Sequence, residues 1–437
     1  MMGGDVVMRI AMLTINYLPF VGGVPISIQR LSQGLRSLGN EVYIFAPTYE
    51  NEVEEDYVIR YRSFDKRIAN GCVIPNCMDP VIKKAFEENS FDLIHVHHPM
   101  LIGNTALHLG KKYGIPVVYT YHTRYEQYLH HLKPYHKLLS HYENEENKVI
   151  KQIEEKVIDF SENKFIPYYI KRFTKQCDMV FAPTTLMKYH LINQGATTDI
   201  EVLPTGLNEA FFQKNQVLAN EIRKTYGGND KFLLCTVSRL EKEKNLSFLL
   251  QGMKRLKEKL GEHFHLLIIG DGTKRAELEQ SVARLGLDHQ VTFVGTIPQE
   301  EISHYYEACD LFVFSSKSET QGIVLLEAMA AGLPVVAIKA SGVNDIVRNH
   351  VNGYTTNEDV EEFSEEIRKL LLDKERYEIV SSGANKTANE YRSISVSKKA
   401  EEFYKEAIVM KGESYASKRL QKKQEKKDLV SYHSLIS

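Results

Sequence analysis

The most constraining feature of this chain is a regular alternation of short apolar segments with helical segments. The apolar segments are rich in Val, Ile and Leu and have the length of buried strands; they are residues 9–14, 41–46, 92–96, 116–120, 178–182, 231–237, 264–269, 291–294, 310–314 and 334–338. Strands that alternate with helices pair in parallel, and the helices cover both faces of the sheet. The pattern therefore predicts an α/β fold built from doubly wound parallel sheets.

The alternation restarts once, after a polar, helix-poor stretch near residues 204–208. A chain of 437 residues is long enough for two or three domains. We therefore predict two Rossmann-like domains that face an interdomain cleft, at residues 8–210 and 211–390. We expect a helix at 391–410 to pack back on the first domain, and the charged segment 411–437 to be a mobile tail.

The composition excludes several classes of protein. Hydrophobic residues make up 43% of the chain and the net charge is −2, so a nucleic-acid-binding protein is not indicated. The five cysteines include no C-x-x-C pair, which argues against a disulfide framework and a zinc site and favours a reducing cytosol. The N-terminus lacks a signal-peptide pattern, and no run of about eighteen apolar residues occurs. We expect a cytoplasmic protein that does not span a membrane.

Two carboxylates flank the start of a helix in the second half of the chain. Glu319 and Glu327 stand on either side of Gly322, which follows a predicted strand and precedes an apolar helix at residues 323–331. Such loops lie at the carboxyl ends of parallel strands, where ligands bind, and a helix N-terminus attracts anions. We expect a phosphate there, ligand hydroxyls on Glu319 and a ribose diol on Glu327. An isolated pair of glutamates is more often a helix cap and a solvated side chain.

Further residues of the second domain fit a phosphate-bearing ligand. Arg239 and Lys244 follow its first predicted strand, where two cations could neutralise a diphosphate whose charge grows as it leaves. Gly270 ends the next strand with a turn at the same edge of the sheet. Taken alone, Arg239 and Lys244 fit a solvated charged loop better than a ligand site, and Gly270 fits an ordinary turn.

Two features of the first domain point to the same kind of ligand. The pair Gly22-Gly23 follows the first strand, and such a turn lets a ligand approach the backbone closely, although most glycine pairs are simply turns. His122 follows the strand at 116–120 and would direct an imidazole toward the cleft, although a single histidine is usually structural. The joint occurrence of all these features at the ligand-binding edges favours the functional interpretation.

These residues resemble the retaining glycosyltransferases of family four, which have the GT-B architecture of two Rossmann-like domains. The resemblance extends from residue 9 to about residue 403, and the Glu-x7-Glu motif is its most specific element. It implies a catalytic set of His122, Glu319, Arg239 and Lys244. It implies donor binding by Gly22, Gly23, Arg239, Lys244, Gly270, Glu319, Gln321, Gly322, Ile323 and Glu327. One departure is Thr320-Gln321, where many members carry an aromatic residue before the glycine.

Within that family, residues 120–131 and 319–322 look like those of the bacterial 1,2-diacylglycerol 3-alpha-glucosyltransferases. This resemblance implies that a hexose, glucose from UDP-glucose, moves to a lipid acceptor, 1,2-diacylglycerol, with its α configuration kept. Because no Asp-x-Asp pair occurs, we expect Arg239, Lys244 and helix N–H groups to stabilise the leaving diphosphate. No metal ligand and no required cofactor are predicted, and magnesium should be dispensable.

The segment at about 124–175 is dense in Tyr, His, Lys and Glu and is predicted to be a helical insertion in the first domain. Tyrosine suits the headgroup level of a bilayer and lysine attracts anionic lipid, so the segment is compatible with peripheral docking to the inner face of the cell membrane. Acidic residues nearly match the basic ones there, and an ordinary solvated insertion is an equal alternative.

Three other functions stay open at this point. One is another family-four specificity, such as mannosyl transfer to a phosphoinositide or sugar transfer to a soluble acceptor. The second is a UDP-sugar 2-epimerase, which shares the two-domain architecture and needs no acceptor. The third is a catalytically silent protein that binds sugar nucleotides. The set of Arg239, Lys244, Glu319 and Glu327 fits a transferase better than either of the last two.

Overall fold

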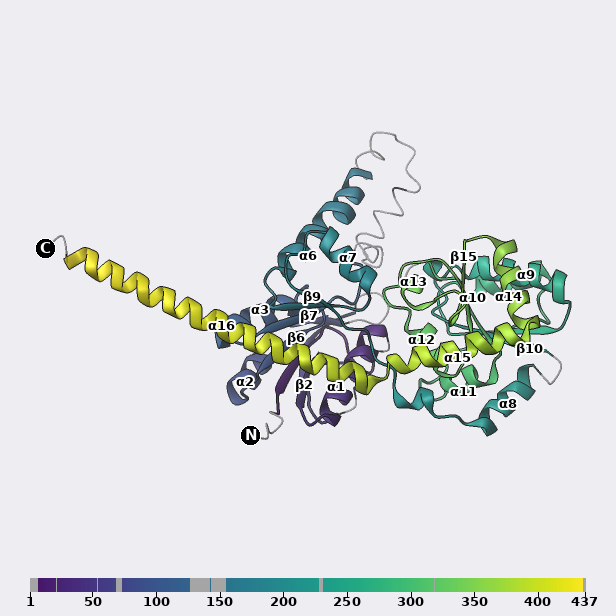
Figure 1. The fold of residues 1–437 in the computed structure, drawn as a ribbon, viewed down its shortest axis with the longest axis horizontal. Helices are drawn as coiled ribbons and strands as arrows, with labels where there is room; N and C mark the ends of the chain where they lie inside the picture. Colours follow the sequence, from purple (N-terminus) through teal and green to yellow (C-terminus); the bar gives the residue numbers. More distant parts are fainter. Residues whose placement is uncertain are drawn as a thin grey trace. The chain divides into compact units, whose positions relative to one another are not determined.

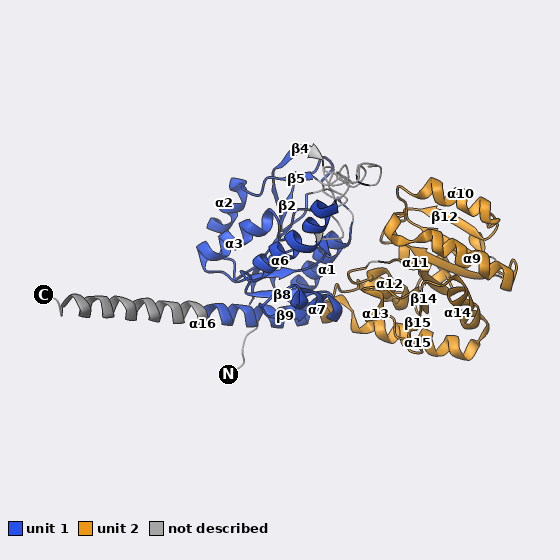
Figure 2. Cartoon of the chain, turned by 90° about the horizontal axis from the view of Figure 1, so that it is seen from above, with its two compact units in different colours: residues 1–203, 397–437 blue, residues 204–396 orange. Residues whose placement is uncertain are grey.

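The computed structural model of this chain describes residues 7–20, 22–52, 54–67, 73–125, 142, 155–227, 231–317 and 319–434. The chain forms two compact units, Met1–Leu203 with Ser397–Ser437 and Pro204–Val396 (Figures 1 and 2). Each unit is a parallel sheet with helices packed on it, so the predicted α/β class with two Rossmann-like domains is confirmed. The cleft between the domains stays a prediction.

Among its described residues, the first unit is built on a seven-stranded parallel sheet in the order β3-β2-β1-β6-β7-β8-β9. Its strands are β1 (Arg9–Leu13), β2 (Glu41–Pro47), β3 (Val58–Tyr61), β6 (Leu93–Val96), β7 (Val117–Thr120), β8 (Met179–Ala182) and β9 (Ile200–Val202). The small antiparallel pair β4 (Ser63–Arg67) and β5 (Val73–Pro75) lies outside this sheet. The five strands that the sequence predicts for this domain are all present.

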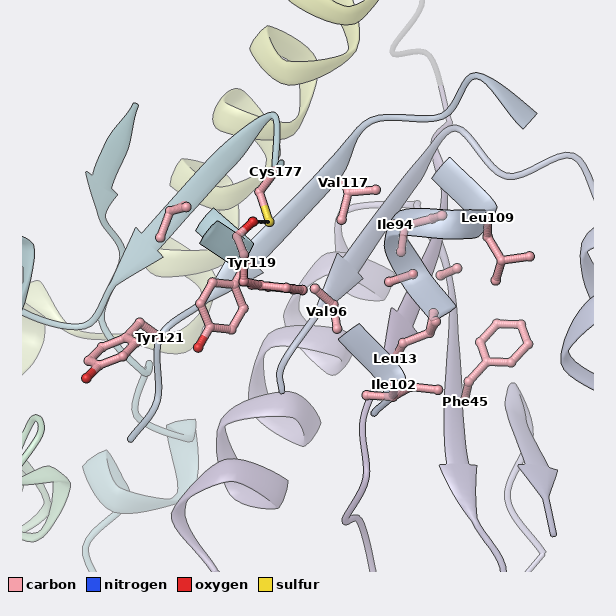
Figure 3. Close-up of a cluster of buried hydrophobic side chains, with 14 of the residues drawn as sticks. Leu13, Phe45, Ile94, Val96, Ile102, Leu109, Val117, Tyr119, Tyr121 and Cys177 are labelled. Carbon is pink, nitrogen blue, oxygen red and sulfur yellow. Dashed lines mark hydrogen bonds between the residues drawn. The ribbon is translucent and has the colours of Figure 1, made fainter. Parts of the chain in front are cut away.

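Helices cover the sheet of the first unit because aliphatic side chains project from both faces of that sheet. The helices are α1 (Gly23–Ser37), α2 (Pro80–Glu88), α3 (Ile102–Tyr113), the π-helix η4 (Ser161–Phe165), α6 (Ile166–Thr174) and α7 (Thr185–Asn193). Figure 3 shows Leu13, Ile94 and Val117 of neighbouring strands facing Ile102 and Leu109 of α3 in one buried cluster. This packing fixes the carboxyl ends of β6 and β7, where His122 and its neighbours lie.

The last helix, α16 (Ser393–Ser434), packs on the first unit. The Tyr404 hydroxyl lies 2.7 Å from Nδ1 of His95, the Phe403 ring packs against Phe181, and Nζ of Lys411 is 2.8 Å from a carboxylate oxygen of Asp178. The helix continues through the segment that the sequence analysis treated as a charged tail, as far as Ser434.

Among its described residues, the second unit has a six-stranded parallel sheet in the order β12-β11-β10-β13-β14-β15. Its strands are β10 (Phe232–Val237), β11 (Phe264–Ile269), β12 (Val291–Gly295), β13 (Leu311–Phe314), β14 (Val335–Ile338) and β15 (Gly353–Thr356). Its helices are η5 (Glu209–Phe212), α8 (Gln216–Tyr226), η6 (Lys242–Lys244), α9 (Leu246–Leu260), α10 (Arg275–Leu285), α11 (Ile302–Ala308), α12 (Ile323–Ala330), α13 (Val343–Ile346), α14 (Val360–Leu372) and α15 (Lys374–Glu390).

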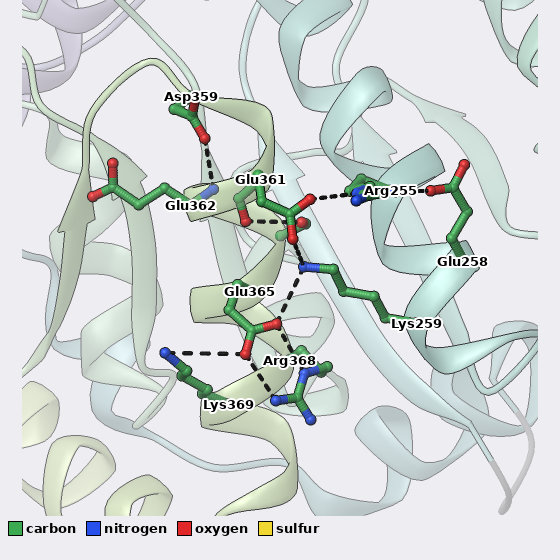
Figure 4. Close-up of polar contacts among 10 residues, drawn as sticks. Arg255, Glu258, Lys259, Asp359, Glu361, Glu362, Glu365, Arg368 and Lys369 are labelled. Atoms are coloured by element: carbon green, nitrogen blue, oxygen red, sulfur yellow. Dashed lines mark hydrogen bonds and ion pairs between the residues drawn. The ribbon is translucent and has the colours of Figure 1, made fainter.

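Charged side chains fasten α9 to α14 at the surface of this unit (Figure 4). Nζ of Lys259 on α9 lies 2.6 Å from a carboxylate oxygen of Glu361 and 3.1 Å from one of Glu365 on α14. Arg368, one turn further along α14, pairs with Glu365 at 2.8 Å. Because several ions share partners, the network is worth more than an isolated surface pair.

The boundary between the units falls earlier than the predicted position of 210/211, and Pro204 is the first residue of the second unit. The reason is that Leu207 is fully buried in the core of that unit. Its N–H donates to the carbonyl of Tyr391 at 2.7 Å, and its own carbonyl accepts from the N–H of Ser393 at 2.8 Å. Leu207 therefore belongs to the second unit.

The predicted insertion at 124–175 is described only in part, because residues 126–141 and 143–154 lie outside the described residues. Residues 155–160 are helical and continue through η4 into α6. In the described part of the chain, no helix combines the length and the apolar character that crossing a bilayer requires.

Candidate active site

The loops at the carboxyl ends of β10, β11 and β13 hold one another in place. The N–H of Leu240, after β10, donates to the carbonyl of Asp271, after β11, at 2.9 Å. The N–H of Lys317, after β13, donates to the carbonyl of Glu243 at 3.0 Å. Gly270 has φ of 128°, and a Cβ there would lie 2.0 Å from the carbonyl oxygen of Ser238. Glycine is therefore required for this close approach of two loops.

The central contact of this edge is an ion pair between two predicted site residues. Nζ of Lys244 lies 2.6 Å from Oε1 of Glu319, and the two side chains are only 14% and 15% exposed. The carbonyl of Lys244 also accepts a hydrogen bond of 2.9 Å from the Ser315 hydroxyl, which fixes the loop from the side of β13. The sequence predicted both charges, and the structure brings them together.

Arg239 occupies a more open position in the same loop. Its guanidinium pairs with Glu243 at 3.0 Å, and its side chain is 48% exposed. An exposed pair of this kind is weak, so the guanidinium can turn to an anionic ligand at little cost.

The start of α12 lies next to Glu319 in the chain. Gly322 precedes the helix with φ of 74°, in the left-handed region, and the first helical residue is Ile323. The first N–H groups of a helix have no partner within it and carry a partial positive charge. The helix therefore begins where the sequence predicts it, and the anion site at Gly322 and Ile323 stays a prediction.

Gln321 and Glu327 have partners inside the second unit. Oε1 of Gln321 accepts from the N–H of Thr205 at 2.7 Å, and its Nε2 donates to the carbonyl of Thr205 at 3.1 Å, with the side chain buried. The side chain of Gln321 therefore anchors the segment that enters this unit, which leaves its backbone for the predicted donor contact. Glu327 is 7% exposed on α12 and accepts a hydrogen bond of 3.4 Å from the Tyr306 hydroxyl.

The glycine pair of the first unit stands at the start of α1, after β1. A Cβ on Gly23 would meet nothing within 4 Å, whereas one on Gly22 would lie 3.3 Å from the Phe20 ring. The backbone of Gly23 is thus open to close approach, as its predicted role requires.

His122 belongs to a cluster of four histidines at the carboxyl ends of β6 and β7. Its Nε2 lies 2.9 Å from Nδ1 of His97, and the two rings are stacked with centroids 5.2 Å apart. The His97 ring in turn lies 4.1 Å from the ring of His95. His98 accepts a hydrogen bond of 3.4 Å at Nδ1 from the N–H of Ile15.

Burial keeps these imidazoles uncharged. It lowers the pKa of His122 and that of His98 to about 3, and it holds the pKa values of His95 and His97 well below the ordinary value. The neighbouring imidazoles contribute to the lowered pKa values of His95, His97 and His98, since one positive charge would repel another. The cluster is therefore neutral across the physiological range of pH.

His122 was predicted from the sequence as a site residue, whereas the other three histidines of the cluster were not. The signal was present, since His95, His97 and His98 stand at the end of the predicted strand 92–96, at the same edge of the sheet as His122. Predicting the contact would have required the register between β6 and β7, in which His95 is opposite Val118.

The two groups of residues differ in their electrostatic character. The second unit offers Arg239, Lys244 and a helix N-terminus, which suit an anionic group that gains charge. The first unit offers an accessible glycine backbone and neutral imidazoles, which suit hydroxyl groups. Within the described ranges, no group of three or more His, Cys, Asp or Glu side chains is placed to hold a metal ion.

Comparison with known proteins gives two matches to family models. The model described as Glycosyltransferase Family 4 matches residues 21–211, and the model described as Glycosyl transferases group 1 matches residues 219–387. The first match includes Gly22, Gly23 and His122, and the second includes Arg239, Lys244, Glu319 and Glu327.

Individual proteins are similar along most of the chain. An alpha-monoglucosyldiacylglycerol synthase of Acholeplasma laidlawii is 26% identical, over 92% of this chain and 98% of that protein. The sulfoquinovosyl transferase SQD2 of Arabidopsis thaliana is 29% identical, over 85% of this chain and 68% of that protein. Among solved structures, the sucrose-phosphate synthase of Thermosynechococcus elongatus superposes with a TM-score of 0.70 at 19% identity, over 92% of this chain and all of that one. This superposition supports the fold.

Proposed function

The chain belongs to the glycosyltransferases that these two family models describe, and on that premise we propose that it moves glucose from UDP-glucose to 1,2-diacylglycerol with retention of configuration. The product is an α-glycolipid. The Lys244–Glu319 ion pair next to the start of α12 is the observation that carries the proposal, because it combines a cation for phosphate with a carboxylate for sugar hydroxyls. The name of the Acholeplasma laidlawii relative, an alpha-monoglucosyldiacylglycerol synthase, supports a glycolipid product.

In this proposal the diphosphate of the donor binds at the carboxyl edge of the second sheet. Lys244, Arg239 and the first N–H groups of α12 neutralise it, and Lys244 contacts the phosphate while it keeps its hydrogen bond to Glu319. Glu319 then accepts hydrogen bonds from hydroxyls of the glucosyl group, and Glu327 holds the ribose. Gly270 lets the loops after β10 and β11 approach each other at the edge where the nucleotide binds. The cations stabilise the leaving group best when its charge is largest, which is the condition for lowering the barrier.

The transfer itself is a substitution on one face of the sugar. The bond from the anomeric carbon to the phosphate oxygen breaks, and the bond to the acceptor oxygen forms on the same side. The departing phosphate oxygen takes the proton of the acceptor hydroxyl, so charge and protons balance. The transition state resembles an oxocarbenium ion, and His122 holds a hydroxyl of the transferred glucose. No magnesium ion is needed, since Arg239, Lys244 and the helix N-terminus supply the positive charge.

An exposed helical face of the first unit supports a lipid acceptor. Phe160, Phe165 and Tyr168 are each more than half exposed, on the helix that runs from residue 155 through η4 and α6. They are three to five residues apart, which places them on one side, since η4 has the wider turn of a π-helix. The opposite side, with Ile166 and Ile170, is buried. We define the exposed side as the basic aromatic face; its cations are Lys164, Arg172 and Lys175.

Such a face suits an anionic membrane surface. Aromatic rings settle at the headgroup level, and each nearby Lys or Arg adds about 1 kcal/mol of attraction to anionic lipid. Docking there would bring the enzyme to the inner face of the cell membrane, where diacylglycerol resides. The proposal thus includes UDP-glucose, a lipid acceptor and an anionic membrane surface as partners.

The first test supplies UDP-glucose and dioleoylglycerol in vesicles of anionic or zwitterionic lipid, with and without EDTA. UDP release and lipid product are followed by mass spectrometry. We expect a glucosyl diacylglycerol that forms on anionic vesicles and survives EDTA. UDP release without lipid product would refute the lipid acceptor and indicate a soluble one. A rearranged sugar without any acceptor would indicate an epimerase.

The second test removes the basic aromatic face. The triple variant Phe160→Ser/Phe165→Ser/Tyr168→Ser should bind anionic vesicles at least about tenfold more weakly than the wild type. Its turnover of a short-chain diacylglycerol in solution should be unchanged. The matched control is Ile379→Ser, which changes an equally exposed apolar side chain on α15 of the second unit. Equal vesicle binding by the triple variant and the wild type would contradict this docking face.

A further inference from the structure

His97 is the best placed residue that the proposed mechanism does not use. It is buried, and its Nδ1 lies 2.9 Å from Nε2 of His122. Its other nitrogen, Nε2, is buried and has no hydrogen-bond partner among the described residues. The Nδ1 of His122 has no hydrogen-bond partner in the described part of the chain, and the residue is only partly buried. His97 thus occupies one nitrogen of His122 and leaves the other for a ligand.

We propose that His97 is a positioning residue for glycosyl transfer: its Nδ1–H donates to Nε2 of His122, so that His122 carries its proton on Nδ1 and donates it to a hydroxyl oxygen of the transferred sugar. This inference rests on the role proposed for His122 beside that sugar. In this proposal His97 determines which nitrogen of His122 carries the proton. His122 then donates a hydrogen bond to the sugar rather than accepting one.

The direction of the hydrogen bond between His97 and His122 follows from the unpaired Nε2 of His97. If His122 were the donor, His97 would carry its proton on Nε2, where it would be a buried N–H without a partner. If His97 is the donor, its Nε2 is an unpaired acceptor instead. Buried N–H groups without a partner are the rarer of the two in proteins, because an unmet donor costs more than an unmet lone pair. The arrangement with His97 as donor is therefore favoured.

The surroundings of the pair keep it neutral. The titratable groups that face these two rings are His95 and His98, and behind His95 stands the Tyr404 hydroxyl of α16, 2.7 Å from its Nδ1. Both nitrogens of His95 have hydroxyl partners, since Thr120 Oγ1 lies 2.6 Å from Nε2. Among the described residues, no carboxylate contributes to the pKa of any of the four imidazoles. Nothing there stabilises an imidazolium.

A neutral donor suits the chemistry of this transfer. The anomeric carbon gains positive charge in an oxocarbenium-like transition state, and an imidazolium close by would repel it. A neutral imidazole can hold a sugar hydroxyl without that penalty. Burial therefore protects His122 from protonation by lowering its pKa, while His97 fixes its orientation.

Three variants test the assignment. His97→Phe keeps an aromatic ring in contact with the ring of His95 and removes both nitrogens. His97→Asn keeps a hydrogen-bonding group near the position of Nδ1. His265→Phe is the matched control, since His265 is a buried histidine at the start of β11 in the second unit, hydrogen-bonded to Thr292. Thermal unfolding of each variant identifies a general loss of fold.

The first readout is the tautomer of His122, measured by ¹⁵N NMR of the full-length protein with ¹⁵N-labelled histidine. We expect a neutral ring protonated on Nδ1 in the wild type between pH 5 and pH 8. In His97→Phe we expect a mixture of tautomers and a higher pKa, because the ring loses the N–H donor that favours its neutral form. A wild-type ring protonated on Nε2 would overturn the proposal. This readout needs no turnover, so it separates the failure of this inference from the failure of the proposed function.

The second readout is the pH profile of kcat with UDP-glucose and diacylglycerol. Loss of orientation at the sugar should lower kcat of His97→Phe by about 100-fold with little change in KM. The activity of this variant should fall further at acid pH, because His122 loses the donor that favours its neutral form. The wild type and His265→Phe should show no such acid limb, and His97→Asn should recover most of kcat. An unchanged pH profile in His97→Phe would show that His97 only fills space.

Discussion

Replacing Lys244 by Met should disable the proposed donor site without disturbing the sheet beneath it. Methionine has a similar length and no charge, so the side chain can follow the same path between the loops. The change removes a cation that the proposal places on the diphosphate, and it leaves Glu319, which is only 15% exposed, without the partner that lies 2.6 Å away. The variant therefore loses both the cation on the diphosphate and the ion-pair partner of Glu319.

The magnitude can be worked from these contacts. A hydrogen bond to a charged group contributes about 1.5–3 kcal/mol. An uncompensated Glu319 at about 5 Å from the diphosphate, with an effective dielectric constant of about 20, adds roughly 3 kcal/mol of repulsion. The sum of about 4–6 kcal/mol corresponds to a fall in kcat/KM of about 10³-fold or more, since each 1.36 kcal/mol is tenfold. Arg239→Met should cost only about three- to tenfold, because the exposed guanidinium is screened by water.

The assay is kcat/KM for UDP-glucose, followed by UDP release. Lys317→Met is the matched control, because Lys317 follows β13 near the same edge and pairs with Glu358 instead, at 2.6 Å. The double variant Lys244→Met/Glu319→Gln tests the repulsion directly: it should lose less than the product of the two single losses, since no bare carboxylate remains. A kcat/KM of Lys244→Met within tenfold of the wild-type value would contradict the proposed role of Lys244. A loss in the double variant equal to the product of the two single losses would contradict the repulsion from Glu319.

Three further outcomes are expected. Gly342→Ala should raise KM for the donor more than tenfold, because φ of 77° disfavours a side chain and the new Cβ would lie 2.7 Å from the carbonyl oxygen of Glu319; an unchanged KM would contradict this contact. Gln321→Leu removes two buried hydrogen bonds to the backbone of Thr205, at about 1 kcal/mol each, and should lower the thermal unfolding midpoint by several degrees, whereas Gln321→Glu keeps one acceptor and should lower it less. Glu365 accepts a hydrogen bond from an α14 guanidinium that lowers its pKa from 4.5 to about 2, so its stabilising effect is present above pH 4.5 and is lost as the pH falls toward 2; the difference in midpoint between the wild type and Glu365→Gln should shrink over that window in calorimetry.

The sequence predicted the buried strands well because apolar runs covered on both faces leave an unambiguous pattern. It missed strands at the edges of the sheets, such as β3 (VIRY), β9 (IEV) and β15 (GYTT), which are short and partly polar. These edge strands are held by pairing with a neighbour rather than by their own composition, so a local pattern does not reveal them.

The candidate site was predictable as a set of residue types but not as a set of contacts. Lys244 and Glu319 were each placed at the ligand-binding edge, yet their ion pair joins loops after different strands. The predicted donor contact of Gln321 stays a prediction, and the hydrogen bonds of its side chain to Thr205, far away in the sequence, had no local signal. The row of histidines depends on the register of β6 against β7 in the same way. In each case the missing information is long-range pairing, which the folded sheet supplies.

The electrostatic contrast between the two groups of residues follows the charges that the proposed transfer develops. The leaving diphosphate gains negative charge, and the second unit meets it with Lys244, Arg239 and a helix N-terminus. The sugar gains positive charge, and the first unit surrounds His122 with imidazoles that burial keeps neutral. A cation in the histidine cluster would oppose the second change as strongly as the lysine favours the first. Neutrality of the one group is therefore as much a part of the proposed catalysis as the charge of the other, which is why the pH profile of His97→Phe and the loss in Lys244→Met test the same transition state from opposite sides.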